Sequence, residues 1–406
     1  MNRAPERGPV VNGEIADWSF IVLLGFASGL SPFGMASVVP ALPAIGRALG
    51  SSAAQLQFVI SGYLLGLGLF QPMQGLLCDR FGRRPVLLGG FSVFIAASLL
   101  AATTHSLPAL AGARLLQALG VSVATVVSRA MVRDTHSPQS AAVALSFITA
   151  VMGIAPILGP LAGGIVVDAA GWPALFQMHA VMGSALLLWM LMSLRETRPT
   201  VTQTMTLRDL FNGFSVLLRE PAFTAHTLTY GFVSGSTFMF LTMGASLFGD
   251  LFGMTASRFG VFWATLAVGY LLGAACAGWS ARRFGARRVI AAATKLGILA
   301  SLAVLFTGEL LPHNLPLWTL SLTLVIFSSG LSSPLSLSSA VSQRADLAGV
   351  ASGLSSSLAM LLSMLCAVVS GLVYHGNPLP NMLLMLGCSV AAWLAARAAY
   401  PRALRG

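Results

Sequence analysis

The chain has 406 residues, of which 56% are hydrophobic and only 9% are charged. A soluble domain carries about 25% charged residues, so this composition excludes an ordinary soluble protein. Basic residues outnumber acidic ones by 23 to 12 and the mean hydropathy is +0.82, which together indicate a membrane protein.

The N-terminal segment 1–17 carries charges but lacks an apolar core followed by a small-residue cleavage site, so it is predicted to be a cytoplasmic tail, not a cleavable signal peptide. Twelve apolar stretches follow, each near the roughly 20 residues that a helix needs to cross the hydrocarbon of a membrane. We predict spans near 18–40, 54–77, 86–104, 108–130, 141–167, 173–194, 222–248, 259–280, 287–308, 316–338, 349–373 and 380–399.

The connecting segments set the orientation. Of the 23 Lys and Arg residues, 20 are assigned to tails and loops on one side, and only Arg47 and Arg258 to the other. Arg114 is predicted to be the only basic residue inside a span. The positive-inside rule then places both termini in the cytoplasm. The basic excess faces anionic lipid and needs no nucleic-acid partner.

A repeated segment divides the chain. Residues 75–84 and 278–287 match at positions 203 residues apart, and both lie between the second and third spans of their half. The central loop 195–221 is the longest connection. We therefore predict a six-helix bundle over 18–194, a second over 222–399, and a C-terminal cytoplasmic tail over 400–406. Repeated halves are typical of secondary transporters, which move one bundle against the other.

Three motifs resemble those of one family. The run Gly-x-Leu-x-Asp-Arg-x-Gly-Arg-Arg over 75–84 resembles the signature loop of the major facilitator superfamily. Arg114, Gln117 and Gly120 resemble a stretched form of its Arg-x-x-Gln-Gly motif. The Gly-Pro-x-x-Gly-Gly run over 159–164 resembles its drug/proton antiporters, and residues 39–43 and 131–134 resemble the Bcr/CflA drug-resistance branch. The resemblance implies an all-α membrane fold of 12 transmembrane helices in two pseudo-symmetric six-helix bundles.

The first motif suggests a conformational latch at the cytoplasmic mouth. A carboxylate there can meet an arginine or a helix N-terminus of the other half, and Gly82 permits a tight turn. The alternative is that the arginines only anchor the chain by the positive-inside rule. In the second half Arg282 replaces the acid, so a second latch must differ. The latch candidates are Gly75, Asp79, Arg80, Gly82, Arg83 and Arg84.

Arg114 is a functional candidate because a charge at membrane depth is costly. Gln117 lies about one turn away and could share its face. The resemblance implies proton coupling or substrate binding, and the alternative is a helix clamp on neighbouring carbonyls. His179 and His226 are further candidates for coupling, because histidine titrates near physiological pH. Packing is the simpler interpretation of both histidines.

The antiporter motif comprises Gly159, Pro160, Gly163 and Gly164, which would let the fifth span bend and pack closely. Serines of the tenth and eleventh spans, Ser328, Ser332, Ser336 and Ser356, are better explained by packing than by substrate contact. The four cysteines have no metal-ligand spacing, so we interpret them as packing residues and expect no metal and no cofactor.

Acidic residues are missing where the branch often has one. None of the 12 acids lies plainly at the middle of a span, and Ala36 occupies the position of an acid in the first span of Bcr/CflA proteins. This absence argues against a strongly cationic substrate and leaves the proton carrier unassigned. Adaptable Phe and Met surfaces suggest a pocket. Its candidates are Phe33, Met35, Tyr230, Ser234, Thr237 and Phe238.

These features favour a monomeric, proton-coupled multidrug exporter in a bacterial-type inner (plasma) membrane. Its substrates would be neutral or weakly charged amphipathic small molecules, including antibiotics, moved by alternating access. A specific carrier for a metabolite such as a nucleoside or a sugar is the alternative within transport. A membrane-embedded enzyme is disfavoured because we find no buried nucleophile–base pair or metal cluster. A P-loop glycine–lysine motif is absent, and the repeat argues against a channel or a receptor.

Overall fold

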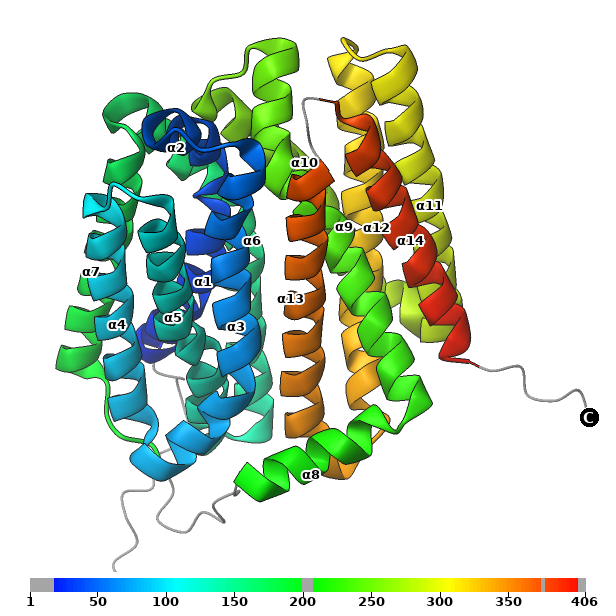
Figure 1. Ribbon diagram of the computed structural model, residues 1–406. Helices are drawn as coiled ribbons and strands as arrows, with labels where there is room; N and C mark the ends of the chain where they lie inside the picture. The colour runs from blue at the N-terminus through cyan, green and yellow to red at the C-terminus, as the bar shows by residue number, and fades with distance from the viewer. Residues whose placement is uncertain (1–17, 199–206, 374–376, 401–406) are drawn as a thin grey trace, which may run out of the picture.

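A computed structural model describes residues 18–198, 207–373 and 377–400, so the predicted tails lie outside it except for Tyr400. The described chain is built from helices packed side by side (Figure 1). The first half contains α1 (Trp18–Ala36), η1 (Val39–Ala41), α2 (Leu42–Leu49), α3 (Ala53–Phe81), α4 (Arg83–Thr103), α5 (Leu107–Thr135), α6 (Pro138–Ala170) and α7 (Trp172–Ser193). The second half contains α9 (Pro221–Phe252), α10 (Ala256–Phe284), α11 (Ala286–Leu310), α12 (Leu315–Val341), η2 (Ala345–Leu347), α13 (Ala348–Val373) and α14 (Leu379–Ala398).

Eleven helical stretches of the described chain are long and apolar enough to cross a membrane. The twelfth is α3, which is bent by 56° between Ala54–Gln71 and Met73–Phe81 and counts as one span if its two parts are taken together. Pro72 stands at the break and has no N–H to bond the preceding turn, which explains the bend. The predicted spans are therefore confirmed in number when α3 counts once, with ends that differ by a few residues.

Local sequence signals set the helix ends. The Ser52 hydroxyl accepts from the Gln55 N–H while the Gln55 side chain accepts from the Ser52 N–H, a capping box that starts α3. Ser106, Ser137 and Thr255 cap α5, α6 and α10 in the simpler way. The predicted central loop 195–221 is not all loop, because it contains α8 (Leu207–Leu218), a short helix that the sequence reading missed.

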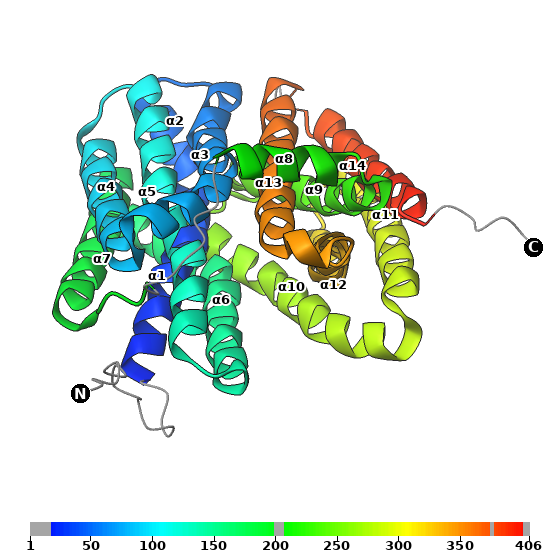
Figure 2. The ribbon, with the colours of Figure 1, turned by 90° about the horizontal axis from the view of Figure 1, so that it is seen from below.

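Two seams join the halves. The helix α3 packs against α13, and α6 packs against α10, whereas most other helix contacts stay within one half. Seen from below, α8 crosses under α9 and α13 (Figure 2). We call this end of the molecule the α8 face and the opposite end, where α2 lies, the α2 face (Figure 1).

The two seams differ in how far they run from the α2 face toward the α8 face. Near that face Gln57 of α3 fills the space beside Gly371 of α13, and halfway along Gly68 still meets Leu361. Farther toward the α8 face, a Cβ added at Gly75 would meet nothing within 4 Å. The adjacent Leu76 nevertheless packs against a cluster that includes Val350 and Leu354 of α13, so α3 stays in contact with the second half near the α8 face. The α6–α10 seam is the one that loosens toward the α8 face, as described below.

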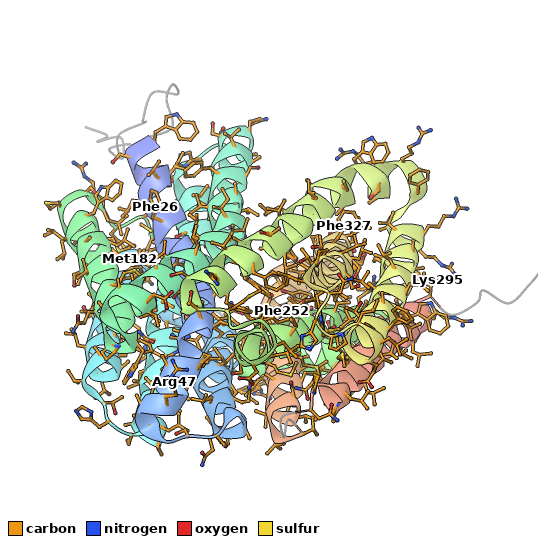
Figure 3. All side chains as sticks on the ribbon, turned by 90° about the horizontal axis from the view of Figure 1, so that it is seen from above. Phe26, Arg47, Met182, Phe252, Lys295 and Phe327 are labelled. Atoms are coloured by element: carbon orange, nitrogen blue, oxygen red, sulfur yellow. The ribbon has the colours of Figure 1, made fainter. Side chains whose placement is uncertain are left out.

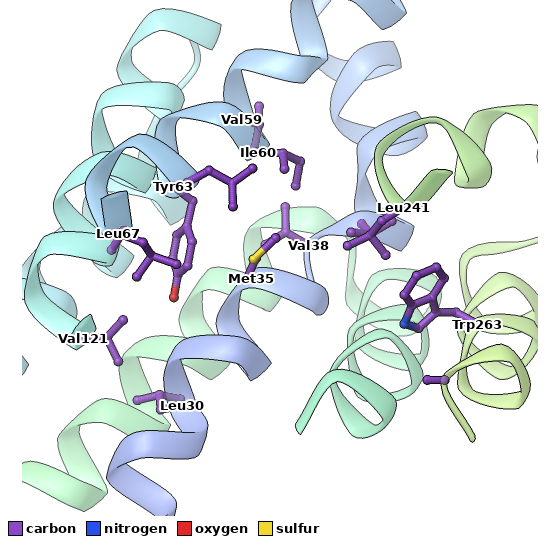
Figure 4. Close-up of a cluster of buried hydrophobic side chains, with 14 of the residues drawn as sticks. Leu30, Met35, Val38, Val59, Ile60, Tyr63, Leu67, Val121, Leu241 and Trp263 are labelled. Carbon is purple, nitrogen blue, oxygen red and sulfur yellow. The ribbon is translucent and has the colours of Figure 1, made fainter. Parts of the chain in front are cut away.

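An apolar core spans the first half and continues into the second. Near its centre Met35 and Val38 of the first half lie beside Leu241 of the second (Figure 4). These three side chains are at most 5% exposed. Many large apolar side chains on the outside of the bundle are exposed instead, as a lipid-facing surface requires. Arg47 marks the α2 face when the molecule is viewed from above (Figure 3).

The helices extend farther than predicted at several ends. Arg129 lies on α5 and Lys295 on α11, both on helices that pass as membrane spans. Lys295 is exposed and extends away from the bundle (Figure 3). A long basic side chain on a span can carry its charge toward the aqueous boundary. That Arg114 is the only basic residue inside a span stays a prediction.

Candidate functional site

A charged network lies at the α8 face, where α3 meets α4. Arg83 Nη1 donates to Asp79 Oδ1 at 2.6 Å, and Arg83 Nε donates to Asp134 Oδ2 at 3.2 Å. Only 8% of the Arg83 side chain is exposed, so these charge-assisted bonds are partly shielded from water. All three residues belong to the first half. In this conformation Asp79 pairs with Arg83 of its own half, and no ion pair among the described residues joins it to the second half as the sequence suggested.

Glu196, just after α7, connects the end of α7 to the start of α4. Its carboxylate accepts hydrogen bonds from the N–H groups of Arg83 at 2.9 Å and Arg84 at 3.1 Å, the first two residues of α4. It also accepts from the N–H groups of Thr197 and Arg198. Partial burial alone would raise the pKa of Glu196, but these four N–H groups outweigh it and hold the pKa below its ordinary value.

Gly82 is required at this corner for two reasons. Its φ of 95° lies in a region that other residues rarely adopt. A Cβ at Gly82 would also lie 2.6 Å from Glu196 Oε2. Gly285, the counterpart in the second half, has φ 83° but no neighbour within 4 Å of an added Cβ. Among the described residues Arg282 forms no ion pair, so the charged network exists only in the first half.

Arg114 lies deep in the first half and is fully buried. Its Nη1 donates to Gln117 Oε1 at 2.9 Å, and its Nε donates to the carbonyl of Val59 at 3.4 Å. The guanidinium carbon lies 4.1 Å from the centre of the Tyr63 ring, a cation–π contact worth about 2 kcal/mol in a desolvated site. No carboxylate pairs with it in the described part of the chain. The positive charge of Arg114 is therefore stabilised by the Gln117 side-chain oxygen, the Val59 carbonyl and the Tyr63 ring.

The partners of Arg114 are themselves anchored. Gln117 Nε2 donates to Ser98 Oγ at 2.7 Å, and the Tyr63 hydroxyl donates to the carbonyl of Ser31 at 2.8 Å. The network thus joins α1, α3, α4 and α5. Arg114 Nη2 has no hydrogen-bond partner among the described residues. This arrangement fits the helix-clamp alternative, and it leaves one buried donor available to a group that enters the bundle.

His179 of α7 is also fully buried, next to the break between α1 and η1. Its Nε2 lies 2.8 Å from Ser37 Oγ, and its Nδ1 has no partner in the described chain. Rings of Phe33, Phe94 and Phe176 surround it at 5.8 to 6.3 Å between centroids. An apolar cage of this kind favours a neutral imidazole that orders the α1 break.

His226 lies near the start of α9, far along the chain from His179 and in the other half. It is fully buried and neither ring nitrogen has a partner among the described residues. The His226 ring packs edge-on against the Tyr400 ring, with 5.1 Å between the two centroids. The Arg287 guanidinium lies over the Tyr400 ring, 5.0 Å from its centroid. The two histidines predicted as coupling candidates therefore do not meet.

The glycines of α6 face two different neighbours. A Cβ at Gly159 or Gly163 would press on the backbone of α1, in the same half. A Cβ at Gly164 would come closer than 3.0 Å to the carbonyl of Ala256 on α10, in the other half. Beside it, Pro160 meets Gly260 of α10 with similar closeness. The motif thus seals one face of α6 to its own half and the other face to the second half.

Polar contacts reinforce the α6–α10 seam. Trp263 Nε1 of α10 donates to the carbonyl of Pro156 at 3.1 Å, which uses a carbonyl that Pro160 leaves free in the helix ladder. At the α2 face, Asp168 Oδ2 accepts from the Ser257 N–H at 2.9 Å. Toward the α8 face the seam loosens, and a Cβ at Gly153 would only touch Leu271 at 3.4 Å.

The predicted pocket residues lie in different surroundings. Met35 is buried, and Thr237 Oγ1 donates to Ser329 of α12 at 3.3 Å. Tyr230 interacts electrostatically with Arg129 of the first half and with Tyr270 of α10. Phe33 packs against His179. Ser234 is 9% exposed and Phe238 packs against the core.

Two cavities lie elsewhere. One, of about 790 Å³, opens on the α2 face between α2, α9 and the start of α10, and carries Arg47, Asp168 and Asp250. The other, of about 10 Å³, lies in the second half and is about the size of one water molecule. Two of the four predicted serines, Ser328 and Ser332, line it.

The whole-chain comparison decides the family. The sequence pattern of the Major Facilitator Superfamily matches residues 24–367, which is most of the chain. This chain belongs to the major facilitator superfamily. It is a multi-pass membrane transporter and not an enzyme.

Named relatives and a solved structure agree with that membership. A chloramphenicol resistance protein of Pseudomonas aeruginosa is 31% identical over 276 residues, which cover 66% of this chain and 64% of the relative. A bicyclomycin resistance protein homolog of Haemophilus influenzae is 24% identical over 344 residues, 84% of this chain and 86% of the relative. The crystal structure of a D-xylose-proton symporter matches with a TM-score of 0.77 at 14% identity, covering 95% and 97% of the two chains.

The sequence motifs of the superfamily identify individual residues but not the residues that they contact. Two motif residues contact residues that belong to no motif, because Arg114 contacts Tyr63 and Gly164 lies against Ala256. Glu196 and Asp168 were counted only as acids at span ends. A signal was present for Asp168, since it follows Gly164 by one helical turn on a helix already identified.

Proposed function

We propose that this superfamily member exports neutral or weakly charged amphipathic small molecules, antibiotics among them, in exchange for protons. Transport would proceed by alternating access between the bundles 18–194 and 222–399. The observation that supports this most is the asymmetry of the α6–α10 seam, which is tightly packed toward the α2 face and looser toward the α8 face. Such an asymmetry is what one end state of a rocking two-bundle transporter requires.

The distribution of charge supports an orientation. The connections at the α8 face carry Arg80, Arg83, Arg84 and Arg198, among others, while Arg47 lies on the α2 face. By the positive-inside rule the α8 face is cytoplasmic, with both termini there, in the plasma membrane of a bacterium. The conformation described is then the inward-facing one, ready to receive substrate from the cytoplasm.

Drug export is supported by relatives and by the absence of an interior acid. Two relatives are named for resistance to chloramphenicol and to bicyclomycin. In the described spans, Arg114 and Arg129 carry positive charge without a carboxylate partner. A strongly cationic substrate would be repelled by these charges, whereas a neutral or weakly acidic one would not.

The latch residues have a defined part in the proposed cycle. In the inward-facing state Asp79 is satisfied by Arg83, so the first half holds its charges internally. Closure of the α8 face would bring the second half against this corner, where Asp79 and Arg80 are still partly exposed. Arg114 and Gln117 would hold α1, α3, α4 and α5 as one rigid body through this movement.

The test is an export assay in an efflux-deficient bacterial strain. Expression is expected to raise the inhibitory concentration of chloramphenicol, bicyclomycin or chemically related compounds, and a proton uncoupler should remove the effect. A variant with Gly89→Ala serves as a matched control, because a Cβ there meets nothing within 4 Å. Unchanged susceptibility across a chemically diverse panel would overturn drug export, and export that survives the uncoupler would overturn proton coupling.

A further inference from the structure

Asp168 occupies an unfavourable place on its own helix. It lies in the last turn of α6, which ends at Ala170. The C-terminal end of a helix carries partial negative charge, so a carboxylate there is destabilising by itself. A partner elsewhere is therefore needed to hold Asp168 at this position. Its side chain is exposed at the α2 face and lines the cavity of about 790 Å³.

That partner is the N-terminus of α10, in the other half. Asp168 Oδ2 accepts from the N–H of Ser257, the second residue of α10, at 2.9 Å. The hydroxyls of Ser257 and Thr255 interact with the same carboxylate. Thr255 itself caps α10 by accepting from the Arg258 N–H at 3.3 Å. The first turn of α10 thus has one cap from its own half and a second, charged cap from the opposite half.

The contact continues a ladder of pairs along the α6–α10 seam. From the α8 side toward the α2 face the pairs are Pro156 with Trp263, Pro160 with Gly260, Gly164 with Ala256, and Asp168 with Ser257. Successive members on α6 are four residues apart, about one turn each. The outermost pair is the only one that includes an ionised group. It is also the first pair that separation of the halves at the α2 face must break.

The structure assigns to Asp168 the role of a clasp between the two halves, which holds the α2 face closed and must release for that face to open. This inference rests on the proposed alternating access and names a residue that controls it. Glu196 shows the same chemistry without this role, since it caps α4 within its own half. The clasp at the α2 face is thus the counterpart of the looser α6–α10 seam toward the α8 face.

The test measures the conformation directly, without a substrate. Two reporters are placed separately in a protein whose native cysteines are replaced. Leu241→Cys reports the α2 side, because Leu241 is 3% exposed and lies in the part of α9 nearer its C-terminal end, beside Met35 and Val38 of the first half (Figure 4). Gly278→Cys reports the α8 side, because Gly278 is exposed on α10. It lies seven residues closer to the α8 face than Leu271, which contacts Gly153 at the loose end of the α6–α10 seam. A membrane-impermeant maleimide labels each from its own side in oriented vesicles.

Asp168→Ala is expected to raise the labelling rate at position 241 about fivefold, which corresponds to about 1 kcal/mol, and to lower labelling at position 278. The labelling rate at position 241 in Asp168→Asn should lie between those of the parent and Asp168→Ala, because an amide oxygen still accepts one hydrogen bond but carries no charge. Asp250→Asn, an exposed acid that lines the same cavity, is the control and should change neither rate.

Equal rates for Asp168→Ala and the parent would overturn the clasp. A rise at both reporters would also overturn it, because general loosening of the fold exposes both sides, whereas release of one face closes the other. These outcomes do not depend on which compounds are exported. If the export assay fails while the two labelling rates move in opposite directions, the proposed substrates are wrong and the clasp stands.

Discussion

Gly163 and Gly164 are neighbours on α6, yet a methyl group on each would meet a different half of the molecule. At Gly163 it would overlap the backbone of Ser37 in the first half, and at Gly164 that of Ala256 in the second. In both cases the nearest backbone atom would lie closer than 3.0 Å, whereas ordinary contact begins near 3.4 Å. Overpacking of this kind costs about 1–3 kcal/mol.

The two substitutions should relieve that strain in different ways. Gly163→Ala can relax only by distorting the first half, so we expect its free energy of unfolding to fall by about 1–3 kcal/mol with little change in conformation. Gly164→Ala can relax by separating the halves at the α2 face. The same 1–3 kcal/mol then appears as a fivefold to hundredfold shift toward the state open at that face.

Thermal unfolding in detergent and maleimide labelling of Leu241→Cys separate these outcomes. Gly112→Ala is the control, since a Cβ there has open space around it. Faster labelling for Gly164→Ala with an unfolding temperature near that of the control would support the reasoning. Equal labelling for both alanine variants would refute it, because the glycines would then serve one common packing role.

Three other predictions concern the first half. Arg114→Ala should reduce export at least tenfold while the amount of protein in the membrane stays unchanged, because Gln117 and Tyr63 lose the charge that orders them; an active variant would contradict this. Gly82→Ala should lower the unfolding temperature more than Gly285→Ala, since both positions have positive φ but only Gly82 abuts Glu196. Glu196→Gln should destabilise the protein at neutral pH, and its difference from the parent should vanish as the pH falls through the depressed folded-state pKa of Glu196. The folded-state pKa of Glu196 is depressed, so its stabilising effect is present above the unfolded pKa of about 4.3 and is lost as pH falls through the folded pKa; a difference that persists in acid would contradict this.

The fold could be predicted because membrane spans leave a strong signal in the sequence. Apolar runs of about 20 residues, charges confined to the connections and a repeat 203 residues apart define the helices and the two halves. Helix α8 was missed because its Leu and Phe residues alternate with Arg208 and Asp209 over only 12 residues. A run that short does not reach the length of a span.

The site was predictable residue by residue but not pair by pair. The motifs identified Asp79, Arg114 and Gly164, yet each acts through a partner that depends on three-dimensional packing. Tyr63 lies 51 residues before Arg114, and Ser257 lies 89 residues after Asp168. Periodicity within one helix cannot reveal such pairs. The residues predicted to form a pocket stay a prediction.

The central claim is that two rigid halves alternate to export a small molecule against the movement of protons. The most direct test uses purified protein in liposomes with an imposed pH gradient and radiolabelled chloramphenicol. The account predicts accumulation on the side of higher proton concentration, at a rate that collapses when an uncoupler removes the gradient and that Arg114→Ala abolishes. Accumulation that ignores the gradient, or none for any compound of a chemically diverse panel, would contradict the account.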